Sequence, residues 1–324
     1  MEFNSEILHI NNIEKVSSDI QLFIKSQLLG FRKQGTVIGL SGGVDSSVTA
    51  ALCAKALGAD KVLGILMPER DSDPKSKTYA ENLANKVGIR TEVFDLTKIL
   101  ESFGVYQTRD AIVKKNFAQF DESCKYRLAV TGSLLEDDRI AIPYLEVSDA
   151  SHNIHKIKLS LDDYYAITAA TTIKLRARMI VLYFLAEKNN YLVAGTTNKS
   201  EYVQGYFVKY GDGGVDIDPI VGLYKSQVYQ LAEFLQIPDE IIKRPASPDT
   251  WNLGVSDEEF FFRLPYRTID LLWYARENNI PVELLEKTLS LTKDQINRIF
   301  ADQERKWKNS MHLRQMPPHW KLQT

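Results

Sequence analysis

The sequence predicts an α/β fold, a doubly wound parallel sheet with helices on both faces. The stretch "TVIGL", residues 36–40, is short, β-branched and free of charge, as in a strand that is buried on both faces. Strand and helix patterns then alternate as far as residue 96, and the alternation resumes after residue 165. This order is typical of parallel strands joined by right-handed helical crossovers.

Each predicted element has its own local pattern. Apolar residues recur at three- and four-residue steps between Ile10 and Leu29, which favours an amphipathic helix. An alanine-rich helix is expected from Ser46 to Leu57, and Gly58 is a suitable residue to end it. The other expected elements are a strand at 61–68, a helix at 74–88, a strand at 89–96, a helix at 171–190 and a strand at 191–196.

We expect one domain over residues 1–324, with two departures from this order. Residues 101–165 are predicted to form an insertion or subdomain between the third strand and the later helix, because short apolar runs alternate there with turn residues as in β-structure. Residues 238–324 begin with a proline-rich loop and are predicted to continue as short helical segments.

The composition is that of an ordinary soluble protein. Of the 324 residues, 44% are hydrophobic and 25% are charged. Forty basic residues against 42 acidic ones give a formal charge of −2, which gives no support to nucleic acid or a membrane as a partner. The two cysteines, Cys53 and Cys124, form no CxxC pair, and the sequence shows no signal-peptide pattern. We therefore expect a cytoplasmic protein.

A glycine-rich turn, "SGGVDSS", separates the first strand from its helix. Backbone N–H groups and the helix dipole point to the same place there, so an anion fits. Gly42 and Gly43 let the backbone approach a phosphate closely, and the hydroxyl groups of Ser41, Ser46 and Ser47 are further donors. The turn lacks the lysine of the Walker pattern. It therefore indicates a different kind of phosphate site, with a simple glycine turn and helix cap as the alternative.

Three charged residues belong to this predicted site. Asp45 lies inside the turn, where an acid would repel a polyphosphate unless a divalent cation lay between them, so it is predicted to bind Mg²⁺. Glu201, near a later helix start, is a second candidate metal ligand, although a glutamate there is more often a capping or solvated residue. Lys225 follows a glycine turn and is a candidate for contact with a γ-phosphate.

The glycine turn resembles the pyrophosphate-binding loop of the N-type ATP pyrophosphatases, which cleave ATP between its α and β phosphates and transfer AMP to a substrate oxygen. Farther along, "GTTNKSE", "FVKYGDGGVD" and "GLYK" resemble, in order and spacing, motifs of the NAD synthetase family. The stretches "TTIKLRARM", "RPASPD" and "SMHLRQMPP" resemble three further motifs of that family. The resemblance covers roughly residues 5–100 and 165–320.

The resemblance implies a role for each matching residue. It implies that the ATP pyrophosphate is held by Ser41, Gly42, Gly43, Asp45, Ser46 and Ser47, and that Asp45 and Glu201 share Mg²⁺. It implies ATP contacts for Arg176, Thr196, Lys225 and Ser247, and deamido-NAD contacts for Lys209, Asp216 and His312. Asp45, Lys209 and Asp212 are the expected catalytic residues. The implied fold is that of the adenine nucleotide alpha hydrolases, in a homodimer whose dinucleotide site lies at the subunit interface.

The implied reaction is the ATP-dependent amidation of deamido-NAD to NAD. The nicotinate carboxylate attacks the α-phosphorus, Mg²⁺ and the loop amides stabilise the departing pyrophosphate, and ammonia then displaces AMP. Asp212 is the candidate for holding ammonium or taking its proton. The chain has no room for an amidase domain before the first strand, so free ammonia is the expected donor, and a separate glutaminase subunit stays open.

Departures from the family pattern keep other functions open. Thr172 stands in place of the common asparagine, Leu175 in place of alanine and Leu313 in place of lysine, and residues 101–165 are longer than the family pattern. These differences favour, as the main alternative, a paralogous AMP-forming amide ligase for another carboxylic acid. A catalytically silent nucleotide-binding protein and a tRNA-modifying enzyme are the remaining alternatives. Both proposed metal acids count against the silent protein, and a tRNA-modifying enzyme would need a basic face.

Overall fold

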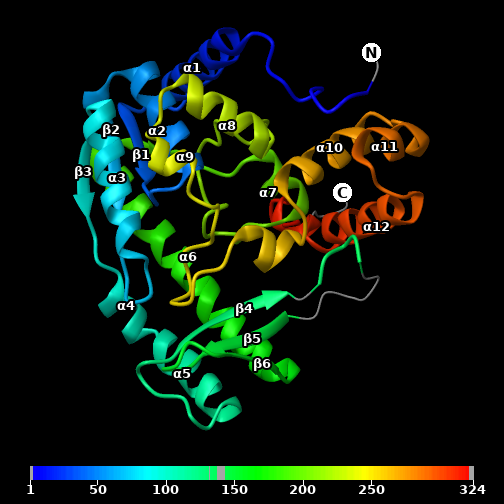
Figure 1. Ribbon diagram of the computed structural model, residues 1–324. Coiled ribbons are helices and arrows are strands. Elements are labelled where there is room, and N and C mark those ends of the chain that lie inside the picture. Colours follow the sequence, from blue (N-terminus) through cyan, green and yellow to red (C-terminus); the bar gives the residue numbers. More distant parts are fainter. Residues whose placement is uncertain (1–2, 131, 137–142, 321–324) are drawn as a thin grey trace.

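The computed structural model describes residues 3–130, 132–136 and 143–320 (Figure 1). Four parallel strands form the central sheet in the order β3-β2-β1-β7. They are β1 (Gly35–Gly39), β2 (Val62–Leu66), β3 (Arg90–Val93) and β7 (Tyr191–Val193). Strand β1 pairs with a strand on each side, and its uncharged β-branched residues are buried on both faces, as predicted.

Helices cover both faces of this sheet, which confirms the predicted fold class. Side chains alternate along a strand, so Val37 and Ile38 of β1 enter opposite layers. On the Ile38 side lie α1 (Ile13–Gly30), α2 (Val44–Leu57), α3 (Pro74–Val87), α8 (Lys225–Phe234) and α9 (Asp239–Ile242). On the Val37 side lie α4 (Thr97–Ser102) and α6 (Leu161–Asn189). The carboxyl ends of the parallel strands β1, β2 and β7 therefore lie at one edge of the sheet, between the two layers of helices.

Helix starts differ from the sequence prediction where a capping residue sets them. Helix α2 begins at Val44 instead of Ser46, because Gly43 takes the N-cap position. Helix α6 begins ten positions before the predicted residue 171, where the Ser160 hydroxyl accepts a hydrogen bond from the backbone N–H of Asp163. The first residues of α6 therefore fall inside residues 101–165, the segment that was expected to form the insertion.

Residues 101–165 hold a second, antiparallel sheet in the order β4-β5-β6. Its strands are β4 (Lys125–Val130), β5 (Pro143–Ser148) and β6 (Ile154–Lys158), and helix α5 (Val105–Asn116) precedes them. A core that includes Tyr126, Leu145 and Ile167 joins this sheet to α5 and to the first half of α6. The β-structure agrees with the alternating pattern, whereas α5 was not predicted.

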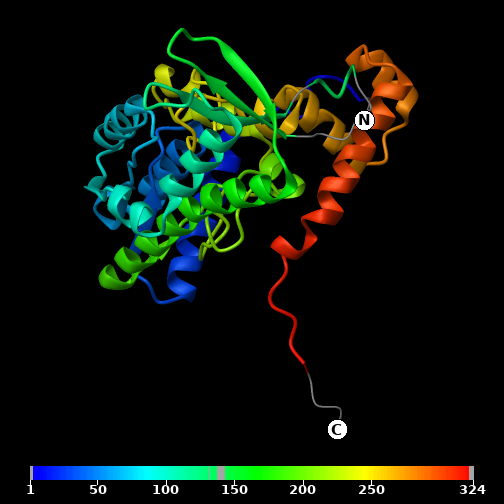
Figure 2. The same cartoon turned by 90° about the horizontal axis from the view of Figure 1, so that it is seen from below.

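The C-terminal part surrounds a separate core on the right of Figure 1. Its elements are α7 (Lys199–Gln204), η2 (Glu258–Phe262), α10 (Tyr266–Glu277), α11 (Val282–Leu289), α12 (Lys293–Asn309) and η3 (Met311–Leu313). A further short helix, η1 (Ala59–Lys61), lies elsewhere in the chain, directly before β2. After η3 the chain leaves the body as an extended segment (Figure 2). None of the helices that the structure describes is long and apolar enough to span a bilayer.

Candidate active site

The glycine turn between β1 and α2 has a backbone that only glycine fits at its centre. Gly42 has a φ of 72°, in the left-handed region. A Cβ atom on Gly42 would lie 2.4 Å from the carbonyl oxygen of Ser76 in α3. Both the conformation and the close approach of α3 therefore require glycine at this position.

The hydroxyl groups of the turn hold its backbone in place. Those of Ser46 and Ser47 donate to the carbonyl oxygen of Gly43 at 3.0 and 2.8 Å, and the Ser41 and Ser46 hydroxyls lie 3.1 Å apart. Gly43, as the N-cap, offers no side chain to the first N–H groups of α2. These backbone donors and the positive end of the α2 dipole therefore form a site for an anion.

A lysine and two acids meet beside this turn. The Lys225 ammonium, at the start of α8 and only 1% exposed, forms an ion pair with Asp45 and lies 3.8 Å from Glu201 Oε1. Asn198 Nδ2 also donates to Asp45 Oδ1, at 3.0 Å. Burial opposes the charge of Lys225, but the surrounding carboxylates raise its pKa well above the ordinary lysine range. The lysine is therefore charged at every physiological pH.

Glu201 has the capping role that its sequence position suggested, and its carboxylate also faces the ion pair of Lys225 and Asp45. It completes a capping box at the start of α7, where its backbone N–H donates to Asn198 Oδ1 at 3.1 Å and its carboxylate accepts from the Asn198 N–H at 3.2 Å. Its other oxygen faces Lys225. Burial and the neighbouring Asp45 carboxylate raise the pKa of Glu201 well above its usual value. Glu201 therefore holds its proton to a higher pH than an exposed glutamate does.

These groups lie at one end of a cavity of about 1020 Å³. The predicted site residues that line it are Ser41, Gly43, Asp45, Ser46, Thr196, Glu201, Asp212, Lys225 and Ser247. Gly42 and Ser47 lie behind this surface and shape the turn. The facing walls include β4 and β5 residues such as Leu128 and Pro143, so residues 101–165 contribute directly to the cavity.

Arg176, the predicted ATP contact on α6, is outside the cavity lining. Its Nη1 donates to Thr172 Oγ1 at 3.2 Å, whereas Arg178 lines the cavity and donates to the backbone carbonyl of Asp249 at 3.4 Å. The register of α6 explains the difference. The cavity-lining face of α6 includes Leu175, Arg178 and Met179, and Arg176 lies about 100° around the helix from Leu175, at the side of that face.

The residues that the resemblance assigned to deamido-NAD are also outside this cavity. Lys209 lines a smaller cavity of about 200 Å³, where its ammonium donates to the carbonyl oxygens of His312 and Gln315 at 2.9 and 2.8 Å. The side chain of His312 is exposed on η3. Asp216 accepts from the backbone N–H of Val193 at 2.8 Å, and so supports β7.

Asp212 combines an exposed side chain with a perturbed carboxyl group. It lines the main cavity, and its Oδ1 accepts from the backbone N–H of Val208 at 2.8 Å. The protein around the cavity removes enough solvent to raise the pKa of Asp212 to about 6, against the effect of the Val208 hydrogen bond. A carboxyl group with this pKa exchanges protons readily near neutral pH.

Sequence reasoning missed several residues of the site. Asn198 orients Asp45, and Asp257 lines the cavity while it accepts from the hydroxyls of Tyr206 and Tyr266, both at 2.9 Å. Asn198 lies inside the recognised stretch "GTTNKSE", where its capping position was a usable signal. Asp257 lies in a segment that matched no motif, and only the fold brings it to the cavity.

Comparison with known proteins agrees with this geometry. The sequence model of the NAD synthase family matches residues 16–135 and 133–317. An NH(3)-dependent NAD(+) synthetase of Rhizobium rhizogenes is 39% identical over 313 residues, which are 96% of this chain and 94% of that protein. The Methanocaldococcus jannaschii protein of the same name is 34% identical over 95% of this chain and 96% of its own length.

Two solved structures share the fold at low identity. The NMN synthetase of Francisella tularensis has a TM-score of 0.67 and 22% identity, and covers 96% of this chain and 99% of its own. The NH3-dependent NAD synthetase of Campylobacter jejuni has a TM-score of 0.63 and 24% identity, with coverages of 95% and 99%. The glycine turn and the acids that flank Lys225 agree with a sequence match that extends along nearly the whole chain. This chain therefore belongs to the NAD synthase family.

Proposed function

We propose that this chain makes NAD from deamido-NAD, ATP and ammonia through an adenylated nicotinate carboxylate, and releases AMP and pyrophosphate. The meeting of Asp45, Lys225 and Glu201 beside the open N-terminus of α2 is the observation that carries this proposal. The relatives are named NH(3)-dependent NAD(+) synthetases, which supports deamido-NAD as the acid substrate and ammonia as the nitrogen donor.

The side chains around the cavity suit an adenylation followed by an amidation. The N–H groups at the start of α2 and the Lys225 ammonium stabilise negative charge on the leaving pyrophosphate. Thr196 and Ser247, which both line the cavity, offer hydroxyl groups to the nucleotide. Asp212 takes a proton from ammonium, for which its raised pKa is suited. No nucleophilic side chain is needed, because positioning and charge stabilisation carry the reaction.

The acids also fit Mg²⁺ shared with the substrate. Among the described residues, no group of three or more His, Cys, Asp or Glu side chains is placed to hold a metal ion alone. Mg²⁺ usually binds one or two carboxylates together with substrate phosphates, and Asp45 and Glu201 would supply these. The raised pKa of Glu201 is consistent with a place for a divalent cation. When bound, the ion stabilises charge on the pyrophosphate.

The nitrogen donor is free ammonia. Cys53 and Cys124 are both buried, and burial raises the pKa of Cys53 to about 12, which leaves it unsuited to attack glutamine. Ammonium should therefore support turnover by the isolated chain, and glutamine at the same concentration should give no NAD. Turnover with glutamine alone would contradict this assignment.

We also propose a homodimer in which the second copy completes the dinucleotide site. Lys209, Asp216 and His312 do not reach the main cavity of their own chain, as expected if deamido-NAD also contacts a partner. Ile180 and Phe184 of α6 are 56% and 59% exposed, and form an apolar surface suited to a second copy. Sedimentation equilibrium tests this, and a monomer at assay concentrations would contradict it.

An acid-substrate comparison tests the function directly. Purified protein with ATP, Mg²⁺ and ammonium should convert deamido-NAD to NAD, as measured by chromatography. The β4 and β5 residues in the cavity wall favour one second candidate, an AMP-forming amide ligase for another acid. Pyrophosphate release with a different carboxylic acid, and none with deamido-NAD, would establish that candidate instead.

A further inference from the structure

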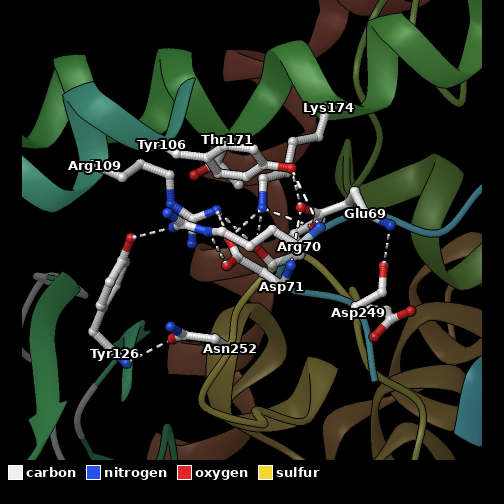
Figure 3. A network of polar contacts seen from close by, with 12 residues as sticks. Glu69, Arg70, Asp71, Tyr106, Arg109, Tyr126, Thr171, Lys174, Asp249 and Asn252 are labelled. Carbon is white, nitrogen blue, oxygen red and sulfur yellow. Dashed lines mark hydrogen bonds and ion pairs between the residues drawn. The ribbon is translucent and has the colours of Figure 1, made fainter. Parts of the chain in front are cut away.

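A buried ionic network joins α5 to the carboxyl end of β2 (Figure 3). Glu69 and Asp71 follow β2 in the chain, Lys174 lies on α6, and Arg109 lies on α5. The Lys174 ammonium donates to Glu69 Oε1 at 2.9 Å and to Asp71 Oδ2 at 2.7 Å. Arg109 Nη1 donates to the same Asp71 oxygen at 3.0 Å. The charges of these four groups balance.

Both cations of the network also hold one backbone carbonyl. The oxygen of Thr250 accepts from Arg109 Nη1 at 3.0 Å and from Lys174 Nζ at 3.1 Å. Thr250 belongs to residues 244–251, every one of which lines the main cavity, and the Arg244 guanidinium also contacts α3. The network therefore fixes one end of a cavity wall.

Two residues of this wall, Asp249 and Arg244, contact α3, which in turn touches the glycine turn. The Asp249 carboxylate accepts from the Ser76 hydroxyl at 3.0 Å and from the backbone N–H of Asp73 at 3.2 Å. Arg244 Nη2 donates to the Ser76 hydroxyl oxygen at 2.9 Å. The carbonyl of Ser76 in turn packs against Gly42. Continuous contacts thus lead from α5 to the turn at the proposed pyrophosphate site.

Arg109 is poorly explained as a simple stabilising residue. Its side chain is 0% exposed, and Nε and Nη2 have no hydrogen-bond partner among the described residues. The guanidinium lies 4.2 Å from the ring centroid of Trp251, which also lines the cavity. Buried ion pairs commonly give little net stability, because desolvation offsets their attraction. What the guanidinium does provide is a fixed position for residues 250 and 251.

We propose that Arg109 is a positioning residue for the nucleotide. Through Asp71, the Thr250 carbonyl and the Trp251 ring, it holds residues 244–251 in place as the wall beside the glycine turn. It acts without contact with the substrate. Residues 101–165, which supply Arg109, are then a working part of the nucleotide site. The inference rests on the proposed function only for the identity of that nucleotide.

The test compares Arg109→Met with the double variant Asp71→Asn/Arg109→Met, which removes both charges of the pair. Lys115→Met is the control, because Lys115 is on the same helix and neither it nor its ion-pair partner Asp163 lines the cavity. Affinity for a non-hydrolysable ATP analogue is measured by calorimetry, local order of residues 244–251 by hydrogen exchange, and stability by thermal unfolding.

We expect Arg109→Met to weaken analogue binding by about 10- to 100-fold and to speed amide exchange in residues 244–251. The double variant should recover thermal stability, because the charges of the network balance again, but it should not recover affinity. The control should change neither. Affinity equal to that of the wild type in the double variant would overturn the inference, and so would failure of the double variant to fold, since the network would then serve folding alone.

Analogue binding needs no amidation, which keeps the two proposals separate. Suppose that the wild type binds the analogue and the variants show these effects, but the wild type makes no NAD. This result would reject the proposed function and support the positioning role of Arg109. Suppose instead that the wild type makes NAD and that folded Arg109→Met binds the analogue with unchanged affinity. This result would support the proposed function and reject the positioning role.

Discussion

At the scale of single residues, Asp45 carries the largest part of the proposed chemistry. Sequence reasoning placed it in the turn, but its partner Lys225 lies 180 positions away, and only the fold shows that they are paired. This pair changes one expectation. From the sequence alone, replacing Asp45 with Ala should leave folding intact, whereas the structure shows that it would leave a buried lysine with Glu201 at 3.8 Å as its nearest acid.

The variant Asp45→Asn separates charge from shape. It keeps a side chain that accepts from Asn198 and Lys225, but it removes the carboxylate proposed to bind Mg²⁺. NAD formation should fall by at least about 100-fold, and the free energy of unfolding by about 1–3 kcal/mol. Steady-state assays and urea unfolding measure both. Asp19→Asn, which breaks an exposed surface pair, is the control, and turnover above a tenth of wild type in Asp45→Asn would contradict its role.

Asp218 predicts a pH dependence of stability. Burial, with a contribution from Asp212, raises its pKa from 3.8 to about 7, and Oδ1 has no hydrogen-bond partner in the described structure. Between about pH 4 and pH 7 the folded protein keeps a proton that the unfolded chain has lost, so the unfolding free energy falls as the pH rises.

The variant Asp218→Asn should remove this part of the pH dependence. Wild type and variant should have similar stability near pH 4, and the variant should be more stable near pH 8 by roughly 1–4 kcal/mol. Urea unfolding at both pH values measures the difference. A variant whose stability follows that of the wild type at every pH would show that the Asp218 carboxyl has an ordinary pKa.

At the scale of elements, the glycine turn and α3 depend on each other. A Cβ atom at Gly42 would meet the Ser76 carbonyl at 2.4 Å, whereas one at Gly43 would meet only the Ser41 hydroxyl, at 3.3 Å, with φ at −96°. Gly42→Ala should therefore cost about 1–3 kcal/mol of stability, and Gly43→Ala less than about 1 kcal/mol. Thermal unfolding compares them, and equal losses would mean that α3 moves aside.

The elements that sequence patterns predicted well are those in which local and tertiary preferences agree. Strand β1 is uncharged because both of its faces are buried, and the glycine after α2 ends that helix. Helix α5 was missed because charged residues interrupt its apolar spacing, and one of them, Arg109, is itself buried. In a sequence pattern, a buried arginine in a helix cannot be distinguished from an arginine on the exposed face.

The choice of Arg176 over Arg178 shows the same limit within one motif. The motif identifies the helix, but the side chain that reaches the cavity depends on the angular position around it. Lys174 and Ala177 lie on the buried face of α6, so Arg178 is nearer to that face than Arg176. A helical-wheel comparison with the apolar residues of α6 would have favoured Arg178.

At the scale of the whole molecule, the candidate site forms where distant segments converge. The turn after β1, the start of α7, the start of α8 and residues 244–251 all line one cavity, together with β4 and β5. Ordered motifs predicted the first four of these contributions. They could not predict the last, because the second sheet lies in residues 101–165, which the family resemblance did not cover.

The central claim is that the α-phosphorus of ATP is transferred to the substrate carboxylate at the turn after β1. Deamido-NAD with heavy oxygen in its nicotinate carboxylate tests this most directly, when AMP and pyrophosphate are isolated after turnover with ammonium. We predict one labelled oxygen in AMP and none in pyrophosphate. Unlabelled AMP, or ADP and phosphate as the products, would contradict the account.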